Sequence, residues 1–216
     1  MIGLLLAAAP ASQPAPNIHQ WFDQLGDQNP QVRDKAIENL MGLSPGDLPA
    51  LQKAVEQSRP IRPSQKTALR DVVTQVFMSG VQYPVNPPGV PFLGLSGDSR
   101  SMDDSASGLV VTRRLPGFAA YRMLRDGDVI NAIEEKPDEH FDAESFKDVV
   151  KDFHPGQVIT LRVLRNGNPM RIPVQLRARP NGIEAVGLEI WFSEHQMDAD
   201  KYWDQHFAAL VGDDVY

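Results

Sequence analysis

One short apolar segment, Pro91–Leu95, carries the residues with the clearest chemical meaning. In it Gly94 stands between Leu93 and Leu95, and an apolar-Gly-apolar triplet before a strand lets a short loop point successive backbone N–H groups at one spot. Such a concavity of amides binds an anion, and the C-terminal carboxylate of a peptide fits it. The triplet is common by itself, and a rival stands at 186–188, so its meaning depends on the elements that come after it in the chain.

An ordered series of short elements succeeds this loop. The longest is an amphipathic helix over 145–153, with Asp142 as its N-cap, in which apolar residues recur at three- and four-residue spacing: Phe146, Val149, Val150 and Phe153. The other elements expected, in chain order, are a strand at 108–112, a Pro-Gly turn at 116–117, a helical turn at 118–121, an Asp-Gly-Asp turn at 126–128, a strand at 129–133, a strand at 158–163, a hairpin turn at 165–168 and a return strand at 170–176.

This order of motifs resembles a PDZ domain. It is most similar to the PDZ domains attached to periplasmic serine proteases of the high-temperature-requirement family, and the resemblance covers about residues 91–178. The Gly-Asp-Val-Ile segment at 127–130 and the Arg-Asn-Gly hairpin at 165–167 are common PDZ features. The resemblance implies an α+β fold, with a small PDZ-type, partly open β-barrel and two helices over residues 91–180.

The resemblance also implies a ligand site. PDZ domains bind the C-terminal tail of a partner as an added strand, between the second strand and the long helix. Carried over to this chain, the loop that holds the carboxylate consists of Phe92, Leu93, Gly94 and Leu95. Leu93 and Leu95 would also form one wall of the pocket for the last side chain of the ligand.

The helix side of the same pocket is expected from Phe146 and Val150, which stand one turn apart. Val149 and Phe153 are expected in the core instead. Because every one of these side chains is apolar, the partner should be a C-terminal peptide or protein with an apolar last residue. The helix has no histidine near its start, so the sequence does not support a preference for Ser or Thr two residues upstream.

The segment directly after the loop departs from the family pattern. Residues 96–107, where the strand that pairs with the ligand should run, are polar and contain few β-branched residues. Either this strand is short or the segment is a mobile flap.

Residues 17–80 show a helical pattern instead. Helices are expected at 17–25, after Asn29-Pro30, after 47 and at 64–79, and residues 25–40 resemble one HEAT-like repeat. A single repeat cannot bury its own apolar faces, so this segment packs on the PDZ unit, forms a homodimer or contacts a partner. Residues 81–90 contain three prolines and are expected to be a stiff linker.

Residues 181–216 exceed the PDZ match. Partial alternation over 183–192 predicts a strand, and a helix is expected from Asp198 through Leu210. This C-terminal extension is expected to pack over the PDZ unit or the helices, and an extension that occupies the ligand groove is the alternative.

Composition excludes several classes of function. The chain has 216 residues and a formal charge of −7, with no basic stripe for nucleic acid. It has no cysteine, so disulfides and thiolate chemistry are excluded. No Gly-x-Ser-x-Gly or His-Glu-x-x-His motif occurs and the five histidines are scattered, so we expect no enzyme, no metal site and no cofactor.

The first 16 residues are read as a candidate signal peptide and linker. An apolar run precedes Ala9-Pro10-Ala11, a small-x-small cleavage pattern, but no Lys or Arg precedes the run. The run is too short to span a bilayer. We therefore expect an exported protein, periplasmic or secreted, and a cytoplasmic one otherwise.

These features together predict a non-catalytic peptide-binding module that works as an adaptor or regulator in the cell envelope. A structural assembly protein whose groove is self-occupied, and a regulatory partner of a separate protease, are the alternatives.

Overall fold

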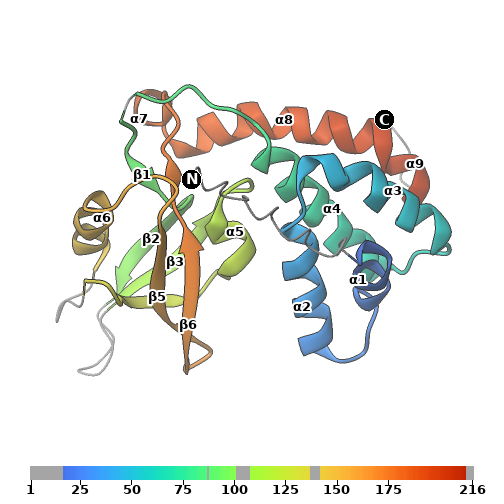
Figure 1. The fold of residues 1–216 in the computed structure, drawn as a ribbon, viewed down its shortest axis with the longest axis horizontal. Coiled ribbons are helices and arrows are strands. Elements are labelled where there is room, and N and C mark those ends of the chain that lie inside the picture. Colours follow the sequence, from blue (N-terminus) through green and yellow to red (C-terminus); the bar gives the residue numbers. More distant parts are fainter. Residues whose placement is uncertain (1–16, 87, 101–107, 137–141, 213–216) are drawn as a thin grey trace, which may run out of the picture.

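The structure, a computed structural model, describes residues 17–212 apart from residues 87, 101–107 and 137–141. The candidate signal peptide and part of the polar segment lie outside these residues. The described chain forms a helical unit and a β unit, and a long C-terminal helix runs along both (Figure 1).

The helical unit agrees closely with the sequence expectation. Asn17 and Asn29 accept backbone hydrogen bonds at the first turns of two helices, and proline stands at the first helical position of the second. Its elements are α1 (Ile18–Gln24), α2 (Pro30–Met41), η1 (Pro45–Asp47), α3 (Leu48–Gln57) and α4 (Pro63–Ser79).

The core of this unit is completed from the far end of the chain. Phe22, Leu51 and Leu69 are fully buried, and they share one apolar cluster with Trp203 and Phe207. The C-terminal segment therefore covers the face that a single helical repeat leaves open.

The β unit contains a five-stranded antiparallel sheet in the order β2-β3-β4-β5-β6, which is not closed, and a separate pair β1-β7. Its elements are β1 (Pro91–Phe92), β2 (Leu95–Arg100), β3 (Gly108–Arg114), α5 (Ala119–Met123), β4 (Val129–Ile133), α6 (Ala143–Lys151), β5 (Val158–Arg165), β6 (Asn168–Gln175) and β7 (Arg177–Ala178). The predicted α+β class, with a partly open barrel and two helices after a helical segment, is confirmed.

The hairpin between β5 and β6 shows how local chemistry sets the register. Arg165 faces Asn168 across a two-residue loop, in which Asn166 and Gly167 have φ of 51° and 78°. Two central residues with positive φ are typical of a type I′ turn, the turn that matches the twist of paired strands.

The described part of the polar segment after the loop, residues 96–100, forms a strand. β2 pairs with β3 over its whole length, with one irregularity between Ser96 and Gly97. Its polar character suits an edge strand, since polar and charged side chains on an edge discourage pairing with other chains.

The C-terminal extension differs from the prediction of a strand plus a helix. It forms α7 (Ile183–Val186), α8 (Leu188–His206) and α9 (Ala208–Val211), so the strand expected over 183–192 is wrong. From Trp191 onward the apolar pattern is helical, because Trp191, Ala199 and Trp203 are buried at intervals of eight and four residues.

Buried polar contacts join the two units. The side-chain oxygen of Gln75 on α4 accepts a hydrogen bond from the N–H of Gly117 (2.6 Å), and its amide nitrogen donates to the carbonyl of Phe118 (3.5 Å). Arg177 on β7 donates to the carbonyls of Ser79 and Gly117 (3.3 and 2.8 Å). The end of α4 is thereby fixed to the segment just before α5.

The linker packs into the same region through Tyr83. The Tyr83 ring lies between Phe118 and Trp191, with ring centroids 6.3 and 4.8 Å away. Phe118 in turn meets Phe92 edge to face at 5.2 Å. These ring contacts connect α8 to the loop that precedes β2.

Candidate functional site

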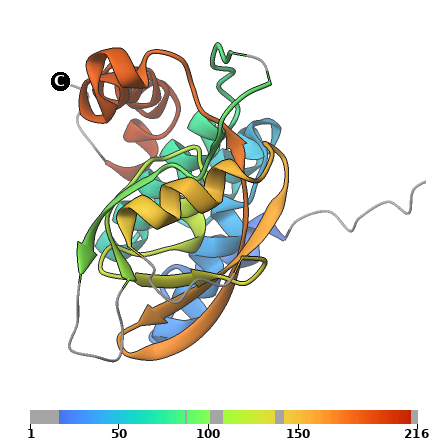
Figure 2. The same ribbon diagram turned by 90° about the vertical axis from the view of Figure 1, so that its left-hand side faces the viewer.

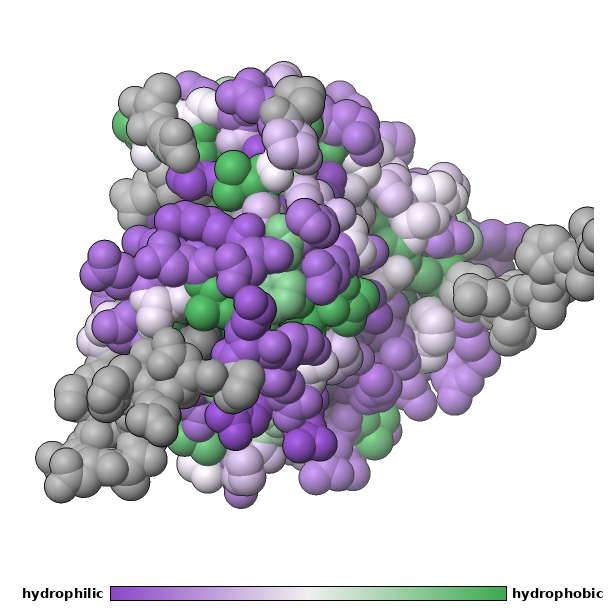
Figure 3. Space-filling model, turned by 60° about the vertical axis from the view of Figure 1, so that its left-hand side comes forward, coloured by the Kyte–Doolittle hydropathy of each residue, from purple (hydrophilic) through white to green (hydrophobic). Residues whose placement is uncertain are grey.

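A groove of about 430 Å³ opens between β2 and α6. α6 packs over the sheet beside β2 (Figure 2). On the side of the molecule that carries α6, apolar surface shows between polar surfaces (Figure 3). The residues that line the groove are Val90, Pro91, Phe92, Leu93, Leu95, Ser96, Gly97, Leu109, Ala143, Phe146, Lys147, Val150, Lys151, Arg179, Ile183 and Gly187.

The structure brings together the residues that the sequence singled out. Five of the six line this groove, and Gly94 does not. Leu93, Phe146 and Val150 are 3, 5 and 6 % exposed, and Phe92 and Leu95 are partly exposed. The floor is therefore apolar, and peptide binding by these residues stays a prediction.

Gly94 is buried beneath the groove. Its φ is +79°, in the region that glycine adopts freely. A Cβ at this position would lie 2.2 Å from the Cβ of Phe118, so only glycine lets the loop approach the Phe118 ring. Gly94 thus shapes the loop between Leu93 and Leu95.

In this loop the main-chain carbonyls accept hydrogen bonds from the protein, whereas two of the N–H groups donate none to the described residues. The carbonyl of Leu93 accepts from the N–H of Ala120 (3.3 Å), and the carbonyl of Gly94 accepts from the N–H of Leu115 (2.7 Å). By contrast, no residue in the described part of the chain accepts a hydrogen bond from the N–H of Leu93 or Gly94. These two donors are therefore unused within the described part of the chain.

β2 has a free edge on the groove side. In an antiparallel pair, residues that exchange main-chain hydrogen bonds alternate with residues that do not. The N–H of Leu115 donates to the carbonyl of Gly94, so these two residues form a hydrogen-bonded pair. The adjacent pair, Leu95 with Arg114, is therefore one that does not exchange main-chain hydrogen bonds. The N–H and C=O of Leu95 therefore point away from β3.

The same reasoning applies to Gly97, which faces Val111. Val111 turns both of its main-chain groups toward β4, because its N–H donates to Asp128 and its carbonyl accepts from Gly127, each at 2.8 Å. Gly97 therefore also points its N–H and C=O away from β3. Leu95 and Gly97 together present an alternating set of donors and acceptors to the groove.

α6 runs antiparallel to β2. The Asp142 carboxylate caps the helix by accepting from the N–H groups of Ser145 (2.8 Å) and Glu144 (3.0 Å), and the bond from Ser145 is the main reason that the pKa of Asp142 is lowered. The N–H of Ala143 donates to Ser99 near the far end of β2 (3.0 Å). The first turn of α6 therefore lies beside the end of β2, and its last turn lies near the loop.

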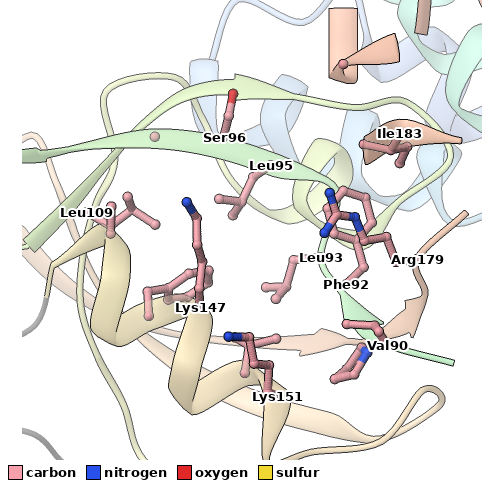
Figure 4. Close-up of a pocket in the computed structure, with 16 residues that line it drawn as sticks. Val90, Phe92, Leu93, Leu95, Ser96, Leu109, Lys147, Lys151, Arg179 and Ile183 are labelled. Carbon is pink, nitrogen blue, oxygen red and sulfur yellow. The ribbon is translucent and has the colours of Figure 1, made fainter. Parts of the chain in front are cut away.

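Basic side chains that the sequence reading missed stand at the rim. Lys147 and Lys151 come from α6, and Arg179 comes from the segment after β7 (Figure 4). The Arg179 guanidinium lies 5.9 Å from the centre of the Phe92 ring. In the sequence each lysine directly follows a predicted pocket residue of the helix, which is the one local hint of its position.

The C-terminal extension closes one end of the groove. Ile183 on α7 and Gly187, the cap residue of α8, line it. The rival triplet 186–188 thus borders the groove as well. Because the groove is open in the structure, the described part of the extension walls the groove and does not fill it.

No group of three or more His, Asp or Glu side chains able to hold a metal ion occurs in the described ranges. Among the helices that the structure describes, none combines the length and the apolar character that crossing a bilayer requires.

The comparisons with known proteins give similar folds at low identity. No protein-family model matches the chain, and no curated protein matches its sequence. The solved structures include a serine endoprotease from Yersinia pestis (22 % identity, 42 % of this chain and 30 % of that chain, TM-score 0.35). Another is the HtrA3 PDZ domain bound to a phage-derived ligand (19 % identity, 41 % of this chain and 86 % of that chain, TM-score 0.35).

A third is the photosystem II D1 C-terminal processing protease (14 % identity, 76 % of this chain and 45 % of that chain, TM-score 0.36). The chain spans about a third of the length of the first protease chains that it matches. The protease chains extend well beyond the part that this chain matches.

Proposed function

We propose that this protein binds the C-terminal segment of a partner, which adds as a strand to β2 in the groove beside α6. One observation carries the proposal: the free edge of β2, with Leu95 and Gly97 directed outward, faces an apolar floor and ends at a loop with two available N–H donors. Main-chain bonds to such an edge supply affinity for any peptide, and the pockets beside it select side chains.

The last side chain of the peptide is proposed to be apolar. It would lie over Leu93, Leu95, Phe146 and Val150, which offer no polar group to a ligand side chain. Burial of a Val, Leu or Phe side chain there is worth roughly 1.5–3 kcal/mol. The carboxylate would accept from the N–H groups of the loop, near the positive charge of Arg179.

We also propose that the protein acts without catalysis, as an adaptor or regulator in the cell envelope or as a partner of a separate protease. The support for export is the apolar start of the chain and its Ala9-Pro10-Ala11 pattern. Fractionation of cells that express the full chain, with mass determination of its N-terminus, tests this part separately.

The binding test uses an immobilised library of decapeptides with free C-termini and randomised last four residues. Enriched peptides are then resynthesised as free acids and as C-terminal amides, and binding is measured by fluorescence anisotropy. We expect saturable binding of peptides with an apolar last residue, and a loss of about tenfold or more for the amide, because a charge-assisted hydrogen bond to the loop disappears.

Backbone N-methylation tests the strand addition itself. A methyl group on an N–H that pairs with β2 removes a hydrogen bond, whereas one on the next N–H points to solvent. A scan of single N-methyl peptides should therefore lower affinity at alternate positions. Equal effects at all positions would argue against an added strand.

A matched pair of variants locates the site. Leu95→Glu places a negative charge beside the proposed carboxylate, on a partly exposed side chain. Val158→Glu makes the same change at a residue of β5 that is 55 % exposed and does not line the groove. Only Leu95→Glu should abolish peptide binding, while both variants should melt near the wild-type temperature. Equal binding of free-acid and amidated peptides, or full binding by Leu95→Glu, would refute the proposal and favour a structural role.

A further inference from the structure

Lys147 has a position in the groove that the proposed function does not yet use. Its side chain extends from α6 toward β2, between Leu95 and Leu109 (Figure 4). It is exposed and lines the groove, and it makes no hydrogen bond or ion pair with any residue that the structure describes. An ammonium group thus stands over an apolar floor, where an added strand would run.

The geometry relates Lys147 to one position of the peptide. An added strand that is antiparallel to β2 and ends at the loop runs from beside Ser99 toward Leu95. Alternate side chains of a strand point the same way, and two residues span about 6.6 Å. Along a helix the same distance takes about four residues, or one turn.

α6 is antiparallel to β2, so positions along the peptide map onto turns of the helix. If the last side chain of the peptide lies beside Val150, the side chain two residues earlier lies one turn toward the helix start, beside Phe146 and Lys147. The intervening side chain points away from the groove. Lys147 is therefore the charged group nearest to the third side chain from the end.

We infer that the partner carries an acidic side chain, Asp or Glu, two residues before its last residue, and that the Lys147 ammonium binds it. This inference rests on the proposed function. A carboxylate there would pair with a lysine that lines the groove and has no described partner.

The other basic residues of the rim are less suited to this role. Lys151 already pairs with Asp148 at 2.7 Å, and it lies one turn closer to the loop. Arg179 comes from the opposite side of the groove, over the Phe92 ring at the loop end. Both raise the positive potential near the carboxylate of the peptide, whereas Lys147 stands beside a side chain.

The test uses defined peptides, because the natural partner is not identified. Decapeptides end in Asp-Ala-Val, Asp-Ala-Leu or Asp-Ala-Phe with a free carboxylate, and each has analogues with Asn or Lys in place of Asp. We expect the Asp peptides to bind about 2- to 5-fold more tightly than the Asn peptides, and the Lys peptides to bind most weakly. The Asp preference should shrink in about 0.5 M salt.

Charge reversal at Lys147, measured with the same peptides, is the decisive experiment. Lys147→Glu should reverse the order, so that the Lys peptides bind better than the Asp peptides. Lys53→Glu, at an exposed residue of α3 outside the groove, changes the net charge equally and should keep the wild-type order. Both sites are on helix surfaces, so circular dichroism and melting should match the wild type.

The outcomes separate the two proposals. If free acids bind better than amides but Asp, Asn and Lys peptides bind equally, or if Lys147→Glu leaves their order unchanged, the inference about Lys147 is overturned and strand addition stands. If free acids and amides bind alike for every sequence, the proposed function itself fails.

Discussion

Gly94→Ala isolates the local feature on which the groove depends. Two separate costs are expected from the structure. The backbone at Gly94 has φ of +79°, and the new Cβ would lie 2.2 Å from the Cβ and 2.4 Å from the Cγ of Phe118. The Phe118 atoms nearest to it belong to the root of a buried side chain, so they cannot simply rotate away.

The magnitude is the sum of these two costs. A left-handed backbone costs a non-glycine residue about 1–2 kcal/mol, and overpacking of a tightly filled site costs about 1–3 kcal/mol. The sum predicts that Gly94→Ala lowers the free energy of unfolding by about 2–5 kcal/mol. For a chain of this size each kcal/mol shifts the melting temperature by about 2–4 °C.

Gly127→Ala is the matched control. Gly127 has φ of +87°, and no atom lies within 4 Å of the Cβ that would be added. It should therefore cost only the backbone strain, about 1–2 kcal/mol. Urea denaturation of the two variants measures the difference, which is the cost of the clash with Phe118; if both variants lose the same stability, the close packing of the loop on Phe118 is refuted.

Three further changes test other parts of the fold. Asp128→Ala should lower the unfolding free energy by about 3–5 kcal/mol in urea melts, because it leaves the Arg165 guanidinium, 16 % exposed, without the carboxylate that binds it at 2.7 and 2.9 Å. Burial raises the pKa of Tyr83 from 10.0 to about 12, against the opposing effect of the Arg177 charge, so the contribution of Tyr83 to stability is complete below pH 10 and is lost as pH rises through about 12. Tyr83→Phe should therefore make the urea midpoint of unfolding less sensitive to pH over this range. An unchanged dependence of the midpoint on pH would contradict the assignment. Trp203→Ala should cost about 3–5 kcal/mol in a thermal or urea melt, because this side chain completes the core of the helical unit, and a loss below about 1 kcal/mol would contradict that role.

The sequence predicted those parts of the fold in which local chemistry decides the structure. Asn29 before Pro30 begins α2, and Asp142 begins α6, as a capping residue should. Asn166 and Gly167 adopt the positive φ angles that a two-residue hairpin needs. In each case a few adjacent residues carry the whole signal, so no distant contact is needed to read it.

The C-terminal extension was misread because its signal is not local. Residues 183–192 alternate partly between apolar and polar, which suits a short strand. Their helical conformation becomes clear only when Trp191 is considered with Ala199 and Trp203, and when Trp203 is seen to join the core of residues far away in the sequence. Tertiary packing overrides a weak local pattern in such segments.

The candidate site likewise contains a part that the sequence predicted and a part that it did not. The apolar floor was predicted because Phe146 and Val150 lie on one face of an amphipathic helix. The basic rim was not, because a lysine on a helix surface looks the same in the sequence whether it faces solvent or a groove. Arg179 reaches the rim only through the pairing of β1 with β7, two strands that are far apart in the chain.

The contacts behind the loop assign a role to the helical unit. The loop lies on Phe118, and the main chain at Gly117 and Phe118 is held by Gln75 of α4 and by Arg177. A loop that must present two N–H groups to an anion loses affinity if it moves, since the ligand would then have to bear the cost of ordering it. Under the proposed function, the helices would affect peptide binding without touching the peptide, because they fix the ring on which the loop rests.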